Sequence, residues 1–179
     1  MGEAVSAGAV HGFPVVRTSF IGRAGPVREL ASLVGQHPLV TVTGPGGSGK
    51  TRLACEVARR VAGRFADGAW LVELAPVQDP GQVPAVVAAV LGVREQPGLP
   101  VAGTLARVLA RRQLLVVLDN CEHVLGAAAQ LCAELNRLLF GSGRLFRLHR
   151  QVLPADRGRG SGRTTPFPRP CGGWGRRVG

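Results

Sequence analysis

The sequence predicts an α/β fold in which a parallel sheet is flanked by helices on both faces. Short apolar runs rich in Val, Leu and Thr alternate along the chain with longer segments whose apolar residues recur at helical spacing. One run, residues 114–118, is apolar at every position, which is typical of a parallel strand covered by helices on both sides. A chain of 179 residues is long enough to bury one such core, so we expect one domain.

The expected elements lie between residues 20 and 139. Residues 1–19 contain Gly, Ala and Val without a period, and we expect a flexible lead-in there. Strands are expected over 39–43, 69–74 and 114–118, and helices over 20–35 (after a short loop), 50–65, 80–91, 99–112 and 125–139. Trp70, on the second strand, is expected in the core.

The last part of the chain has a different composition. Thirteen of the 39 residues in 141–179 are Gly or Pro, and the segment carries nine arginines against one acidic residue, Asp156. Most of the formal charge of +11 therefore belongs to this segment. Such composition is typical of low-complexity chain, so we expect a core over 20–140 and a disordered tail over 141–179. Binding of nucleic acid through the basic tail is one possible function.

A glycine-rich motif follows the first expected strand and precedes a helix. Its residues, Gly44-Pro45-Gly46-Gly47-Ser48-Gly49-Lys50-Thr51, fit the pattern G-x-x-x-x-G-K-[ST]. The glycines allow backbone N–H groups to turn inward around an anion, and the helix adds the positive end of its dipole. Lys50, the only lysine in the chain, is expected to reach the β- and γ-phosphates, and the Thr51 hydroxyl to ligate Mg²⁺. The motif predicts a P-loop NTPase that binds ATP or ADP through residues 44–51 and the following Arg52.

A second set of polar residues follows the apolar run 114–118. Asp119 ends this strand, where ligands bind in α/β sheets, and we expect it to hold the Mg²⁺ shell. The alternative is that Asp119 caps the next helix. Glu122 either orients the attacking water or lies on a helix surface, and both interpretations stay open. His123 is interpreted as structural.

The cysteines and the hydropathy pattern bear on location. Cys55, Cys121, Cys132 and Cys171 form no CxxC pair, so we expect reduced, mostly buried thiols in a cytoplasmic protein. The first residues show neither the basic nor the apolar part of a signal peptide. No apolar run approaches the roughly 20 residues that span a bilayer, so no membrane partner is expected.

These residues together resemble the signal-transduction ATPases with numerous domains, of the NB-ARC-like kind found in large bacterial regulators of the LuxR and antibiotic-regulator types. The resemblance rests on the segments 13–15, 18–23, 40–54, 68–76 and 114–123. It implies that Ile21 and Arg23 lie against adenine and ribose, and that ADP holds a closed state while ATP permits a signalling one. It also implies slow hydrolysis at most, carried by Lys50, Asp119 and Glu122, with regulatory domains on the same polypeptide as partners.

The sequence also departs from this family. After Arg23 the family has an acidic residue, where this chain has Ala24-Gly25-Pro26. The family's strand after Asp119 ends in a Thr-Ser-Arg element that senses the γ-phosphate, and residues 144–150 take that place with three arginines. We therefore expect a sheet that is incomplete at its C-terminal side, for which an out-of-frame tail on a truncated gene would account. Direct DNA binding by this fragment is not expected; the alternatives are a metabolic kinase or efficient ATPase, and nucleic-acid binding by the tail.

Overall fold

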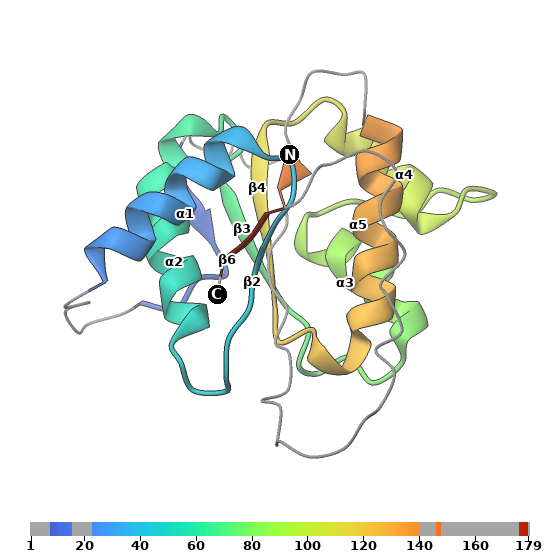
Figure 1. Cartoon of the computed structure of the whole chain (residues 1–179). Helices are drawn as coiled ribbons and strands as arrows, with labels where there is room; N and C mark the ends of the chain where they lie inside the picture. Colours follow the sequence, from blue (N-terminus) through green and yellow to red (C-terminus); the bar gives the residue numbers. More distant parts are fainter. Residues whose placement is uncertain (1–7, 16–22, 140–145, 148–175, 179) are drawn as a thin grey trace, which may run out of the picture.

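The computed structural model describes residues 8–15, 23–139, 146–147 and 176–178, the last two ranges as backbone (Figure 1). The elements in chain order are β1 Val10–His11, α1 Ala24–Gln36, β2 Val40–Val42, α2 Lys50–Val61, η1 Ala62–Arg64, β3 Ala69–Glu73, η2 Pro80–Gln82, α3 Val83–Val90, α4 Val101–Leu109, β4 Leu114–Asp119, η3 Glu122–Val124, α5 Leu125–Leu139, β5 Phe146–Arg147 and β6 Arg176–Val178. The predicted alternation of strands and helices is confirmed, with boundaries shifted by a few residues.

All recorded strand pairs are parallel. One sheet has the order β1-β3-β4-β5, and β2 pairs separately with β6. The longest ladder joins β3 to β4, from Ala69 opposite Leu115 to Glu73 opposite Asp119. A parallel sheet flanked by helices is the fold class that the sequence predicts.

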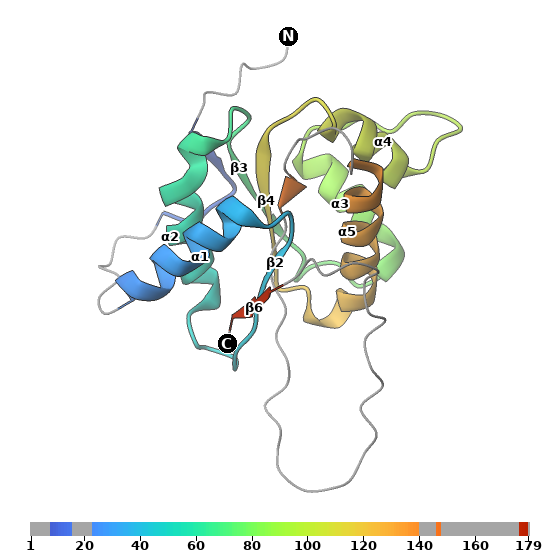
Figure 2. The same ribbon diagram turned by 45° about the horizontal axis from the view of Figure 1, so that its top comes forward.

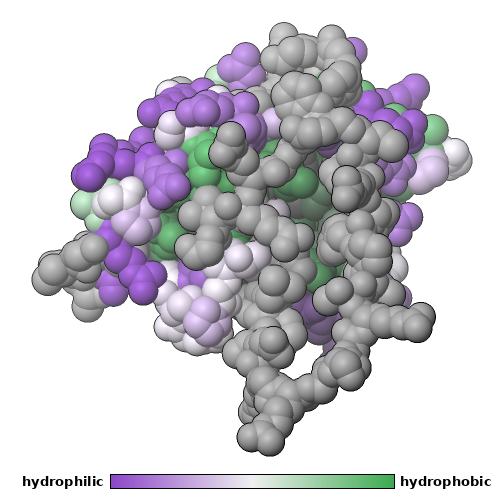
Figure 3. Space-filling model, in the orientation of Figure 1, coloured by the Kyte–Doolittle hydropathy of each residue, from purple (hydrophilic) through white to green (hydrophobic). Residues whose placement is uncertain are grey.

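The two faces of the sheet are covered by different helices. Every residue of β4 is buried, and alternate positions face opposite sides. Leu114, Val116 and Leu118 pack in the core formed with α3, α4 and α5. Leu115 and Val117 pack in the core formed with α1, α2 and β2. Figures 1 and 2 show these two helical layers on opposite sides of the strands. In the space-filling view, hydrophobic side chains are visible towards the middle of this face, with hydrophilic ones around them (Figure 3).

The segment before α1 contains a strand that the sequence prediction missed. β1 lies inside the expected flexible lead-in, so that expectation is wrong for Val10 and His11, which pair with Ala69 and Trp70 of β3. The imidazole of His11 stacks on the Trp70 indole with ring centroids 3.9 Å apart. Trp70, expected in the core, is partly buried at its edge and donates from Nε1 to the Asp67 carbonyl oxygen at 2.8 Å.

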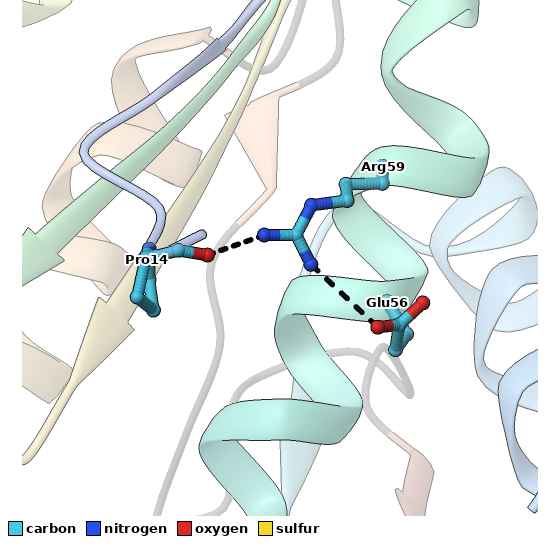
Figure 4. Close-up of polar contacts among 3 residues, drawn as sticks. All are labelled: Pro14, Glu56 and Arg59. Atoms are coloured by element: carbon cyan, nitrogen blue, oxygen red, sulfur yellow. Dashed lines mark hydrogen bonds and ion pairs between the residues drawn. The ribbon is translucent and has the colours of Figure 1, made fainter. Parts of the chain in front are cut away.

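A side chain of α2 also holds the chain beyond β1. Arg59 donates from Nη2 to the carbonyl oxygen of Pro14, while its Nη1 lies 3.6 Å from a carboxylate oxygen of Glu56, one turn earlier (Figure 4). The described N-terminal segment is therefore held by backbone pairing with β3 and by a guanidinium contact with α2.

Two short strands fall within the expected tail. β5 pairs with the first two residues of β4, and β6 pairs with all of β2, so disorder is the wrong expectation for these five residues. The rest of 141–179 lies outside the described residues. Of the segment 144–150, the described part forms only the two-residue strand Phe146–Arg147, consistent with a segment that lacks the apolar run of a central strand.

Candidate nucleotide-binding site

The glycine-rich segment forms the loop between β2 and α2. Gly47 and Gly49 have φ angles of 73° and 80°, a region that side chains disfavour. A Cβ added at Gly46 or Gly47 would meet nothing within 4 Å, so these glycines leave space around the loop. The Ser48 N–H donates to the Pro45 carbonyl oxygen at 3.3 Å, which folds the loop on itself. This is the backbone shape in which a loop wraps around an anion.

Lys50 lies within the curve of this loop. Its side chain is 4% exposed, and Nζ donates to the carbonyl oxygens of Gly44 at 2.8 Å and Pro45 at 2.6 Å. The Ser48 hydroxyl accepts a third, longer contact at 3.3 Å. An ammonium that is buried against loop oxygens is positioned beside any phosphate that the loop binds.

The helix that follows the loop adds two features. α2 begins at Lys50 and runs for twelve residues, so its positive dipole end lies at the loop. Thr51 and Arg52, both partly buried, follow Lys50 in the first turn. A threonine hydroxyl at this position is an oxygen donor of the kind that Mg²⁺ prefers.

Asp119 is the second candidate oxygen donor. It is the last residue of β4 and is 1% exposed, and it faces the same side of the sheet as Val117, towards the α1–α2 layer. The end of β4 and the loop after β2 both lie in the lower part of the ribbon in Figure 1. The N-cap residue of the following η3 helix is Cys121, so Asp119 is not its N-cap.

A hydroxyl and a carboxylate from two elements fit a Mg²⁺ ion that takes its other ligands from phosphates and water. In the described part of the chain, no group of three or more His, Cys, Asp or Glu residues is arranged to hold a metal ion alone. Thr51 and Asp119 are therefore the candidate donors, and a bound nucleotide would have to complete the site.

Arg23 reaches the loop from the start of α1. Its Nη1 donates to the carbonyl oxygen of Ser48 at 2.7 Å and would lie 3.7 Å from a Cβ added at Gly49. The expectation that this residue contacts adenine and ribose stays a prediction; the structure brings its guanidinium to the phosphate loop. Ile21, the other predicted adenine contact, lies outside the described residues.

A polar contact that sequence analysis missed joins the ends of β3 and β4. Asn120 follows Asp119 with a φ of 52°, and its Nδ2 donates to Oε1 of Glu73 at 2.7 Å. The Ala75 N–H donates to the same oxygen at 3.2 Å. Only the register of β3 against β4, which places Glu73 opposite Asp119, makes this pair visible.

The remaining predicted residues lie beyond the strand end. Glu122 begins η3 and is exposed. Nε2 of His123 lies 2.7 Å from the Val77 carbonyl oxygen, in agreement with a structural role.

Three of the four cysteines are described, and all three are buried thiols. Burial raises the pKa of Cys55, raises that of Cys121 from 9.0 to about 11, and raises that of Cys132 to about 12. Cys171 lies outside the described residues. Among the helices of the described segments, none combines the length and apolar character that crossing a membrane requires.

Mycobacterial proteins are similar to this chain in sequence. An uncharacterized protein of Mycobacterium tuberculosis (strain H37Rv) is 40% identical over 120 residues, which are 67% of this chain and 30% of that protein. "Putative HTH-type transcriptional regulator Rv0890c" of the same organism is 44% identical over 106 residues, which are 59% of this chain and 12% of that protein. The chain thus spans less than a third of the curated relatives it matches. No protein-family model matches the chain.

One solved structure is similar over most of the chain. The Aeropyrum pernix ORC2 protein, in ADPNP–ADP complexes, has a TM-score of 0.56 and 21% sequence identity, over 77% of this chain and 43% of that one. At this identity the likeness concerns the fold. The parallel sheet, its two helical layers and the loop between β2 and α2 are those of the P-loop NTPase fold.

Proposed function

We propose that this chain is an ATP/ADP-binding switch module of a transcriptional regulator that hydrolyses ATP slowly at most. One observation carries the nucleotide part of the proposal. Lys50 is 4% exposed and is held by the oxygens of a glycine-rich loop at the N-terminus of α2. A buried cation, a helix N-terminus and backbone N–H groups around one loop are the features that bind phosphate.

Each residue of the site has a defined task in this proposal. The Lys50 ammonium exchanges the Gly44 and Pro45 carbonyl oxygens for oxygens of the β- and γ-phosphates. The loop N–H groups and the start of α2 bind the same phosphates. Thr51 and Asp119 are the residues that would hold Mg²⁺, which when bound neutralises phosphate charge. Arg23, whose guanidinium is on the Ser48 carbonyl oxygen, lines the approach to the loop from α1.

The regulatory part of the proposal is supported by two likenesses. The sequence segments around the loop, β3 and β4 resemble the NB-ARC-like ATPases of bacterial regulators, in which nucleotide exchange switches the state of the protein. Over 106 residues the chain is also 44% identical to a protein whose name describes a helix-turn-helix type of regulator. We propose that the partners are the nucleotide and regulatory domains carried on one polypeptide, and that Ile21 and Arg23 approach adenine and ribose.

The test is calorimetric titration of the whole chain with ADP and with Mg·ATP, together with a separate turnover assay. Binding of both nucleotides with turnover well below the roughly 1–10³ s⁻¹ of ordinary enzymes would support the switch module. Turnover within that range would favour the efficient ATPase instead. If the chain bound neither ADP nor Mg·ATP, the proposal would be overturned.

A second assay addresses nucleic-acid binding by the tail. Filter binding of single-stranded RNA and duplex DNA is compared between the wild-type chain and a full-length variant with Arg157, Arg159, Arg163 and Arg169 changed to Gln. Under the proposed function neither nucleic acid is retained at physiological salt. Tight, salt-dependent retention that the variant loses would assign the function to the tail instead.

A further inference from the structure

A second carboxylate lies beside Asp119 at the carboxyl edge of the sheet. Glu73 is the last residue of β3, and the register places it opposite Asp119 on β4. Two positions earlier on these strands, Leu71 and Val117 pack in the core with α1 and α2. Because side chains two positions apart on a strand share a face, Glu73 and Asp119 both face the layer that carries the phosphate loop.

Asn120 orients this carboxylate. Its φ of 52° is in the left-handed region, which asparagine tolerates better than most residues, and its amide is a donor that glycine lacks. Oε1 of Glu73 accepts from Asn120 Nδ2 at 2.7 Å and from the Ala75 N–H at 3.2 Å. Oε2 receives no hydrogen bond from any residue that the structure describes. One oxygen of Glu73 is thus held by protein donors, and the other is available to a water molecule.

We propose that Glu73 is the residue that orients and deprotonates the water that attacks ATP, and that Asn120 is the residue that positions it. This inference rests on the proposed nucleotide-binding function and names the hydrolytic carboxylate of that site. The water oxygen forms a bond to the γ-phosphorus, and the bond from that phosphorus to the β,γ-bridging oxygen breaks with its electron pair staying on ADP. The proton from the water moves to Oε2 of Glu73 and from there to solvent.

Glu122, the candidate from the sequence, is the carboxylate that competes with Glu73 for this role. It is exposed on η3, three positions after Asp119, and no strand pairing places it at the edge of the sheet. Glu73 instead belongs to a strand whose last residue pairs with the last residue of β4. Changing either glutamate to Gln keeps its size and removes one carboxylate, so the two substitutions differ only in position.

The experiment measures single-turnover hydrolysis of Mg·ATP and, separately, the affinities for ADP and Mg·ATP. Glu73→Gln should lower the hydrolysis rate about 100-fold or more, as is usual for loss of a general base. Its affinities should stay within about threefold of wild type, because the residue acts on water and not on the phosphates. Glu95→Gln, at an exposed position in the loop between α3 and α4, should leave both rate and affinities within about threefold. Glu122→Gln should slow hydrolysis much less than Glu73→Gln does. The reverse pattern, a slow Glu122→Gln and a normal Glu73→Gln, would overturn the inference.

Asn120→Gly tests the positioning role without straining the backbone, since glycine adopts a positive φ readily. We expect hydrolysis about tenfold slower with unchanged affinities, consistent with a lost orienting contact. The double variant Glu73→Gln/Asn120→Gly should be no slower than Glu73→Gln alone, because both changes remove the same function. Independent, multiplying losses would mean that Asn120 acts elsewhere. A wild-type chain that binds nucleotide without hydrolysing it would overturn this inference and leave the binding function standing; a chain that binds none would overturn both.

Discussion

Arg23 and Ser48 are 25 positions apart in the chain, yet the Arg23 guanidinium donates a 2.7 Å hydrogen bond to the Ser48 carbonyl oxygen. The contact links the start of α1 to the phosphate loop. Arg23→Ala removes both the tether and a positive charge near the loop, so we expect affinity for ADP to fall about tenfold or more, in the range of a hydrogen bond from a charged group. Arg23→Lys keeps the charge but lacks the planar guanidinium, so its affinity for ADP should lie between those of the wild type and Arg23→Ala. Calorimetry measures the affinity for ADP. If it is unchanged in Arg23→Ala, the contact between Arg23 and Ser48 has a structural role only.

Lys50→Ala should abolish measurable nucleotide binding. The ammonium lies among the loop oxygens, and loss of its charge-assisted contacts typically costs about 1.5–3 kcal/mol or more, at least a tenfold loss of affinity. Titration with Mg·ATP and ADP measures the change, and circular dichroism checks that the variant is folded. An affinity equal to that of wild type would contradict the P-loop assignment.

Asp119→Asn should weaken ATP binding more in Mg²⁺ than in EDTA. The substitution keeps the shape of a side chain that is 1% exposed and removes the charge that would act through the metal. The affinity for ATP is measured in both buffers for the wild type and the variant. Equal losses in the two conditions would mean that Asp119 serves the fold and not the metal.

The native thiols should resist alkylation. Burial raises the pKa of Cys121 to about 11 and that of Cys132 to about 12, so at pH 8 about one Cys121 in a thousand is the reactive thiolate. Because the pKa is raised, the thiolate fraction grows only as pH rises towards 11. Mass spectrometry after iodoacetamide treatment should find Cys55, Cys121 and Cys132 unmodified in buffer and modified in guanidinium chloride. Rapid native labelling of Cys121 or Cys132 would contradict the packing of the core in which both thiols are buried.

The chain as given should be weakly stable and poorly soluble. β2, the strand before the phosphate loop, pairs with the three-residue strand β6. Within the described ranges it forms no pairing with β4, so it is not joined to the sheet that contains β3 and β4. We expect a melting temperature at or below the roughly 45–65 °C of mesophile domains, with a strong tendency to aggregate. A monomeric sample with a cooperative transition above that range and brisk turnover would show this expectation to be wrong.

The sequence predicts the parts of the fold that depend on local pattern. β4 is apolar at five consecutive positions, and α2 repeats its apolar residues at helical spacing, so both are predicted and confirmed. β1 is missed because two residues carry no period; what defines it is pairing with β3, far along the chain. The same pairing brings the backbone at Ala9 close to Gly68, where a Cβ would lie 2.5 Å from the Ala9 carbonyl oxygen.

The candidate site also contains residues that the local sequence predicts and contacts that it does not predict. The loop, Lys50 and Asp119 follow from a motif and a strand end, both local features of the sequence. The Glu73–Asn120 contact and the Arg23–Ser48 contact join residues 47 and 25 positions apart, and neither follows from spacing. Long-range side-chain contacts depend on strand register and helix placement, which only the folded chain supplies.

The alternation along β4 has a consequence for engineering. Leu114, Val116 and Leu118 contribute to one packing cluster, while Leu115 and Val117 contribute to the other. A library that varies the even-numbered positions would repack α3, α4 and α5 without touching the neighbours of α2. A library at the odd-numbered positions would do the reverse. β4 thus separates two packing clusters that can be varied one at a time. Stabilising substitutions can be sought in the cluster with α3, α4 and α5 while the residues packed around α2 and the phosphate loop are kept.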